Sequence, residues 1–144
     1  MHSKIKAGSI VAALVATLAL CGAAVASAAT VPTRTGASNL STTGVSFTGH
    51  YSFHSPGYDH GGMGYPGKIC DTSADGNPVR VHAKVEGYGY GSSTWERRGN
   101  GNCTTEDQYV YDPAALYVTQ GKIEACQDRG VLPDLCKASP TYYR

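Results

Sequence analysis

The clearest pattern in the chain is the segment Val79-Arg80-Val81-His82-Ala83-Lys84-Val85-Glu86. Its apolar side chains occupy every second position, and the positions between them carry charged or polar side chains. A period of two places alternate side chains on opposite faces of a β-strand. The segment therefore predicts an antiparallel strand with one face in a core and the other face in water.

The flanking sequence carries the same kind of signal. Asp75-Gly76-Asn77 precedes the strand and predicts a tight turn, because Asp-Gly accepts the positive φ angles of hairpins. Residues 45–53 alternate in the same way, and residues 114–121 could alternatively start a short helix. Further short strand-like runs cover 68–70, 109–111, 116–119 and 123–126. Many short strands between glycine-rich turns predict an all-β fold, a small antiparallel β-sandwich or partly open barrel.

Residues 1–29 have the composition of an export signal. Lys4 and Lys6 precede an almost wholly apolar run that ends in small residues. Small side chains at these positions suit a signal peptidase, and we expect cleavage near Ala28. An uncleaved membrane anchor is the alternative interpretation. The prediction is a signal peptide over 1–29 and a secreted, extracellular protein with no membrane segment after cleavage.

About 115 residues follow the leader, which is room for one domain. Residues 30–44 are rich in Thr, Ser and Gly and predict a flexible N-terminal arm. The compact β domain is then expected over 45–144. Without Lys4 and Lys6 the chain carries 10 basic and 11 acidic side chains. This balance argues against a nucleic-acid partner, because such proteins normally show a strong basic excess.

Four cysteines, Cys70, Cys103, Cys126 and Cys136, follow the leader, and Cys21 lies within it. An even number in an exported chain predicts two disulfides. Three pairings are possible. We favour Cys70–Cys103 and Cys126–Cys136, because the second pair encloses a compact loop with Gly and Pro turns. A four-cysteine zinc site is the alternative, but the spacings of 32, 22 and 9 residues differ from the close pairs of such sites.

The turn before the alternating strand resembles the first half of a calcium loop. Asp71, Ser73 and Asp75 offer oxygens at alternate positions, and Gly76 allows the sharp bend. The last ligand position holds His82 instead of an acid, and a strand replaces the usual helix. These residues are a weak calcium candidate, since a plain Asx-type turn explains them equally.

Three histidines, His50, His54 and His60, fall close together in the sequence. On a strand His50 and His54 share a face but lie about 13 Å apart, too far to share one metal ion. We therefore expect surface or loop histidines and predict no metal and no cofactor.

Tyrosine is concentrated among glycine and serine residues. The chain has 10 tyrosines and one tryptophan. Aromatic rings on a rigid β scaffold suit contacts with a sugar or another protein. The alternative is that much of this set forms the core, because aliphatic residues are few. The candidate binding residues, on loops 55–67 and 87–101, are Tyr58, Tyr65, Tyr88, Tyr90 and Trp95.

No catalytic motif is present: the chain has no G-x-S-x-G elbow, H-E-x-x-H helix or P-loop. His82 and Glu86 share a strand face, and Arg97 and Arg98 follow in the sequence. A base, an acid and an arginine could cleave RNA. Polar residues on the wet face of a strand explain the same pattern, so no catalytic residue is predicted.

Several motifs between Lys68 and Cys136 carry a resemblance to a known group of proteins. They are Cys70-Asp71-Thr72-x-Ala74-Asp75-Gly76, Gly99-x-Gly101-x-Cys103, Cys126-x-Asp128 and Pro133-Asp134-x-Cys136. The pattern resembles small secreted proteins of actinobacteria, which are two-disulfide β domains without an assigned activity. The resemblance implies an exported, disulfide-linked β domain and transfers no catalytic residue.

The functional expectation is a non-enzymatic domain that binds an extracellular protein or polysaccharide, and we expect a monomer. One alternative is an inhibitor of an extracellular hydrolase, with Gln127 to Leu135 as the protruding loop. Residues 111–122 are similar to subtilisin-inhibitor sequences, although the cysteine spacing differs from theirs. The other alternative is a small secreted hydrolase that uses His82 and Glu86.

Overall fold

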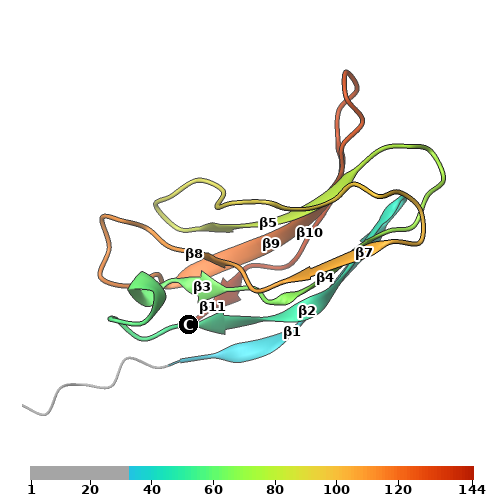
Figure 1. Cartoon of the computed structure of the whole chain (residues 1–144). Helices are drawn as coiled ribbons and strands as arrows, with labels where there is room; N and C mark the ends of the chain where they lie inside the picture. The colour runs from blue at the N-terminus through green and yellow to red at the C-terminus, as the bar shows by residue number, and fades with distance from the viewer. Residues whose placement is uncertain (1–32) are drawn as a thin grey trace, which may run out of the picture.

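The structure, a computed structural model, describes residues 33–144 (Figure 1). The predicted signal peptide, residues 1–29, lies outside the described residues. Over the described range the fold is all-β, with eleven strands and one short 3-10 helix, η1 (Asp59–Gly61). Within this range no helix is long and apolar enough to cross a membrane.

The first sheet is antiparallel and is built around a long central strand. Its strands are β1 (Thr35–Thr42), β2 (Val45–Phe53), β3 (Met63–Gly64), β4 (Gly67–Asp71), β7 (Cys103–Glu106) and β8 (Tyr109–Val110). Strand β2 pairs with β1 on one side. On its other side it pairs with β4 along its first half and with β3 along its second half. Strands β7 and β8 extend the sheet beyond β4 and β3.

The second sheet is also antiparallel and lies over the first (Figure 1). Its strands are β5 (Val79–Val85), β6 (Thr94–Glu96), β9 (Gln120–Gln127), β10 (Leu135–Ala138) and β11 (Tyr142–Tyr143). Strand β9 pairs with β5 on one side and with β10 and β11 on the other. The predicted all-β fold, a sandwich or partly open barrel, is confirmed.

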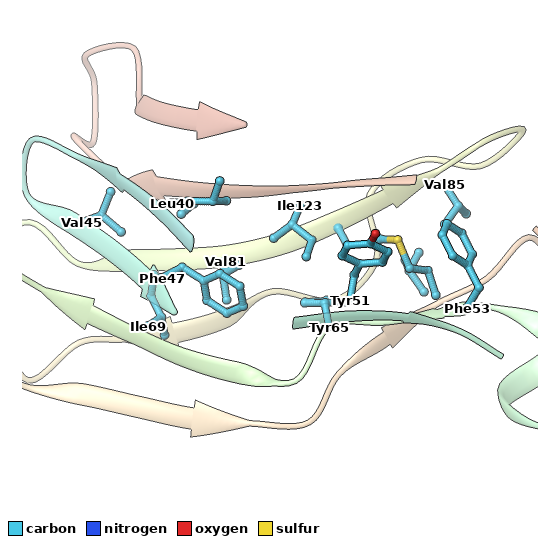
Figure 2. Close-up of a cluster of buried hydrophobic side chains, with 14 of the residues drawn as sticks. Leu40, Val45, Phe47, Tyr51, Phe53, Tyr65, Ile69, Val81, Val85 and Ile123 are labelled. Atoms are coloured by element: carbon cyan, nitrogen blue, oxygen red, sulfur yellow. The ribbon is translucent and has the colours of Figure 1, made fainter. Parts of the chain in front are cut away.

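Strand β5 follows the alternation that the sequence predicts. Val79, Val81, Ala83 and Val85 are all buried between the sheets. They meet Phe47, Ile69 and Ile123 in one apolar core, and Figure 2 shows side chains of both sheets pointing into the same space. Removing this apolar surface from water is the main force that holds the two sheets together.

The prediction of a flexible N-terminal arm is wrong for residues 35–42. Residues 35–42, the greater part of the arm predicted at 30–44, form β1, which pairs with β2 over its whole length. Leu40 is buried in the core, and the hydroxyl of Tyr142 donates a hydrogen bond to Ser38. The domain therefore begins before Val45. The sequence of β1 carries little alternating apolar pattern. The order of this strand comes mainly from its backbone pairing with β2.

Both predicted disulfides are confirmed. Cys70–Cys103 joins β4 to β7, and Cys126–Cys136 joins β9 to β10. In each case the two cysteines stand directly opposite one another in the strand register. Each bridge therefore links neighbouring strands within one sheet.

Candidate functional site

A cleft of about 410 Å³ opens between the loop after β5 and the segment that begins with β8. Its lining is dominated by tyrosine and contains no side chain that is charged at neutral pH. The lining residues are Tyr88, Tyr90, Gly91, Ser92, Tyr109, Val110, Tyr111 and Pro113. A concave aromatic surface with several hydroxyl groups is a typical ligand-binding lining.

A second hollow of about 470 Å³ adjoins this cleft and shares Tyr109 with it. His60 lines this hollow, and its ring stacks on the ring of Tyr111 with a centroid distance of 4.4 Å. His60 and Asp59 both have positive φ angles, which non-glycine residues rarely adopt. The backbone is therefore locally strained at the bend that places His60 beside the tyrosines.

Backbone contacts hold the loop that carries Tyr88 and Tyr90. Gly91 N donates to Ala83 O at 2.8 Å, so the loop folds back along β5. Gly87 has a φ of 75°, and an added Cβ there would lie 2.6 Å from a carboxylate oxygen of Asp112. Only glycine suits such a position. The turn therefore brings the loop directly against the segment that follows β8.

Tyr65 does not line the cleft, which corrects its assignment as a binding residue. It is 1% exposed, and its hydroxyl donates to the backbone oxygen of Ser92 at 2.7 Å. Burial raises the pKa of Tyr65 to about 12, so the phenol stays protonated. The hydroxyl of Tyr65 thus holds the backbone of Ser92, which is one of the lining residues of the cleft.

Two other predicted binding residues lie away from the cleft. Tyr58 is exposed on the loop before η1, and its ring lies 4.9 Å from the ring of His54. Trp95 lies on β6 between two arginines, with its ring centroid 5.2 Å from Cζ of Arg80 and 4.2 Å from Cζ of Arg97. Of the five candidates, only Tyr88 and Tyr90 line the cleft.

Tyr109 and Tyr111 line the cleft but are not among the five predicted binding residues. Both flank the buried Val110, so the period-two pattern of 109–111 places the two tyrosines on the face opposite the core. That signal was present in the sequence. The pairing of β8 with β3, which sets this face beside the loop of Tyr88, is a tertiary feature.

His82 lies behind Tyr90 and is 7% exposed. The two rings stack with a centroid distance of 4.1 Å, Nε2 of His82 lies 3.1 Å from Oε2 of Glu124, and Nδ1 lies 3.3 Å from Oγ of Ser93. Burial lowers the pKa of His82 despite the nearby carboxylate of Glu124. This network supports the tyrosine that forms one wall of the cleft.

The hydrolase alternative named His82 and Glu86, but the acid that contacts His82 is a different one. The carboxylate of Glu86 accepts a hydrogen bond from Thr119 instead, and Glu124 of β9 takes the place beside His82. Ligand atoms of His82, Glu124 and Cys126 lie within 4.8 Å of one another. Cys126 is bonded to Cys136, so it offers no thiolate to a metal ion.

The calcium candidate forms a hydrogen-bonded turn. Oδ1 of Asp71 accepts from Ser73 N at 2.9 Å. Asp75 accepts from Ser73 Oγ at 2.8 Å, from Asn77 N at 3.0 Å and from Gln127 Nε2 at 2.7 Å. These hydrogen bonds lower the pKa of Asp75, with the Asn77 amide as the largest cause. The carboxylate of Asp75 is therefore engaged in tying the turn to β9.

The hairpin between β9 and β10 projects from the body of the domain, as the orange-red loop at the top of Figure 1. Val131 at its tip is fully exposed, and Leu132 is more than half exposed. Disulfide Cys126–Cys136 closes the base, and Arg80 forms an ion pair of 2.6 Å with Asp134. The hairpin is thus a braced projection with an apolar tip.

Comparison with known proteins finds no match: no family model, no curated protein and no solved structure is similar to this chain. The fold and the cleft define a small disulfide-linked all-β domain with an aromatic cleft.

Proposed function

We propose that this chain is an exported binding domain whose tyrosine-lined cleft holds an uncharged polysaccharide. The observation that carries the proposal is the lining itself. Four tyrosines surround the cleft, and none of its lining residues is charged at neutral pH. A charged ligand would find no counter-ion in this lining, whereas a neutral sugar chain needs only ring faces and hydroxyl partners.

The arrangement also favours an extended ligand over a single sugar. The cleft and the adjoining hollow share Tyr109, so a ligand of several units can contact both. Tyrosine has few rotatable bonds and loses little conformational entropy on binding. The bracing of the cleft by Tyr65 and His82 keeps the reorganisation cost of binding low.

Export is part of the proposal. Two disulfides suit an oxidising compartment, where such bonds form and persist. The N-terminal pattern of a basic start, an apolar run and a small-residue exit supports the same conclusion.

The test is a binding titration of the oxidised domain with soluble oligosaccharides of cellulose, chitin, xylan and starch, together with pull-down on the insoluble polymers. We expect one neutral series to bind, with affinity rising with chain length. Tyr88→Ala and Tyr109→Ala should each weaken binding about tenfold, which corresponds to about 1.4 kcal/mol.

The matched control is Tyr143→Ala, because Tyr143 is also an exposed tyrosine but lies on β11 outside the cleft. It should bind like the wild type. Failure of every neutral oligosaccharide to bind would contradict the proposal. Equal affinities of the Tyr88 and Tyr143 variants would place the ligand elsewhere.

The hairpin tip favours a second candidate function, inhibition of an extracellular hydrolase. Gly130 has a φ of 64° and Leu132 N donates to Arg129 O at 3.3 Å, so the tip is a closed turn. Such a tip would fill an apolar pocket of the enzyme as a knob. The test is a panel of proteases and glycanases: Val131→Asp should abolish inhibition, and full activity of every enzyme with the wild-type domain would exclude this candidate.

A further inference from the structure

A serine near the end of β2 and the histidine that directly follows the strand are in direct contact. Oγ of Ser52 lies 2.8 Å from Nε2 of His54. On the other side of the same ring, Nδ1 lies 2.8 Å from Oδ2 of Asp59. A hydroxyl on Nε2 and a carboxylate beside Nδ1 is the order of groups that activates a serine nucleophile.

Local structure explains why these side chains meet. Ser52 lies on β2 and His54 directly follows its last residue, two positions further on, so the continuing extended backbone places both side chains on the same face. Gly64 stands opposite Ser52 on β3, and an added Cβ there would lie 2.8 Å from Nε2 of His54 and 2.9 Å from Oγ of Ser52. A glycine at this position is therefore what leaves room for the contact.

Asp59 reaches the histidine from the strained turn at η1. Its φ of 44° lies in the left-handed region, which costs a non-glycine residue free energy. The carboxylate lies beside Nδ1 at ion-pair distance but off the line of a ring hydrogen bond. Asp59 thus faces Nδ1 of His54 without touching the reacting atoms, and it is a positioning residue for the ring.

An apolar hollow of about 330 Å³ opens at Ser52. Its lining contains Ser52 and His50 together with small or apolar groups of β1, β2 and the β3–β4 connection. The lining residues are Thr35, Gly36, Ala37, His50, Tyr51, Ser52 and Pro66. A short apolar acyl group would fit beside the serine hydroxyl in this hollow.

We propose that Ser52 is a nucleophile, activated by His54 and Asp59, that accepts the acyl group of small apolar esters. Oγ of Ser52 attacks the carbonyl carbon, and its proton passes to Nε2 of His54. The bond from the acyl carbon to the leaving oxygen breaks, and that oxygen takes the proton from His54 and leaves as the alcohol. Water then attacks the acyl-serine, its proton returns through His54 to Oγ of Ser52, and the carboxylic acid departs.

The test uses the full oxidised domain and two probes, an alkyl fluorophosphonate and p-nitrophenyl butyrate. Peptide mapping by mass spectrometry should find one phosphonyl label, on Ser52. His54→Ala should slow labelling about 100-fold, the usual lower contribution of a general base. Asp59→Asn should slow labelling less than His54→Ala does, and Asp59→Glu should restore part of the rate, because a carboxylate can again face Nδ1 of His54.

The same strand supplies a matched control. Ser46 lies on the outer face of β2 and has no serine–histidine contact among the described residues, so Ser46→Ala should label at a rate close to the wild type. Tyr88→Ala should also label normally, which separates this site from the polysaccharide cleft. The absence of a label on Ser52 would overturn the proposal, as would a wild-type rate in His54→Ala. Mapping on the wild type keeps the test valid if a variant fails to fold.

Discussion

At the scale of single residues, the buried carboxylate of Glu96 links a strand of the second sheet to the first sheet. Glu96 of β6 is fully buried, and its carboxylate accepts hydrogen bonds from Arg98 Nη2 at 2.5 Å and from Thr104 Oγ1 at 2.7 Å. Arg98 also donates to the backbone oxygen of Cys103. Because Thr104 and Cys103 belong to β7, these contacts connect β6 to the first sheet.

This carboxylate makes the stability of the domain dependent on acid. The hydrogen bond from Arg98 is the main cause that lowers the pKa of Glu96 from 4.5 to about 2. A lowered carboxyl pKa in the folded state contributes stability that is present above pH 4.5 and lost as the pH falls toward 2. Arg98→Ala should therefore lower the urea midpoint at pH 7, and its difference from the wild type should shrink across that range.

Arg97→Ala is the control, because Arg97 is adjacent and exposed but contacts the ring of Trp95. Urea titrations followed by fluorescence at pH 7, 4 and 2.5 would check the expectation. A constant difference between Arg98→Ala and the wild type at all three values would contradict it.

At the scale of elements, the β1–β2 hairpin depends on its turn. Gly44 has a φ of 80°, and an added Cβ would lie 2.1 Å from Nε2 of Gln127. Gln127 is buried on β9 and donates to Asp75, so it has little freedom to move away. The turn glycine therefore sets both the hairpin and its contact with the second sheet.

Gly44→Ala should destabilise the domain by more than about 2 kcal/mol, through backbone strain and the clash together. Gly57→Ala separates the two causes. Gly57 has a similar φ of 88°, but no atom lies within 4 Å of its added Cβ. It should cost only the backbone term of about 1–2 kcal/mol, measured as the free energy of unfolding. Equal losses in the two variants would contradict the role of Gln127.

At the scale of the whole molecule, the two disulfides differ in how much chain they close. Cys70–Cys103 spans 33 residues of sequence, whereas Cys126–Cys136 spans 10. A longer closed loop removes more entropy from the unfolded chain. The first bridge closes a loop that contains β5 and β6. Because this loop is the longer one, the first bridge restricts the unfolded state more strongly than the second.

Replacing both cysteines of the first bridge by alanine should cost about 3.7 kcal/mol, against about 2.7 kcal/mol for the second. Denaturant unfolding of the two double variants would measure the difference of about 1 kcal/mol. A larger loss for the Cys126–Cys136 variant would show that the short bridge acts mainly by holding the projecting hairpin in the native state.

Local patterns in the sequence determined much of this protein. The alternation of 79–86 predicts β5, and the even cysteine count with a compact loop predicts both bridges, because these signals depend on near neighbours. The same logic predicts Tyr88 and Tyr90 as exposed residues among glycines. It fails for β1, whose order comes from pairing with β2 and from burial of Leu40.

Only the tertiary structure decided which distant residues meet. In the folded domain Tyr109 and Tyr111 lie across the cleft from Tyr88. Tyr65 is buried in the core, and Glu124 lies beside His82. Such contacts depend on the register of strands far apart in the chain. A one-residue shift in register exchanges the two faces of a strand, so the core that fixes the register also fixes the site.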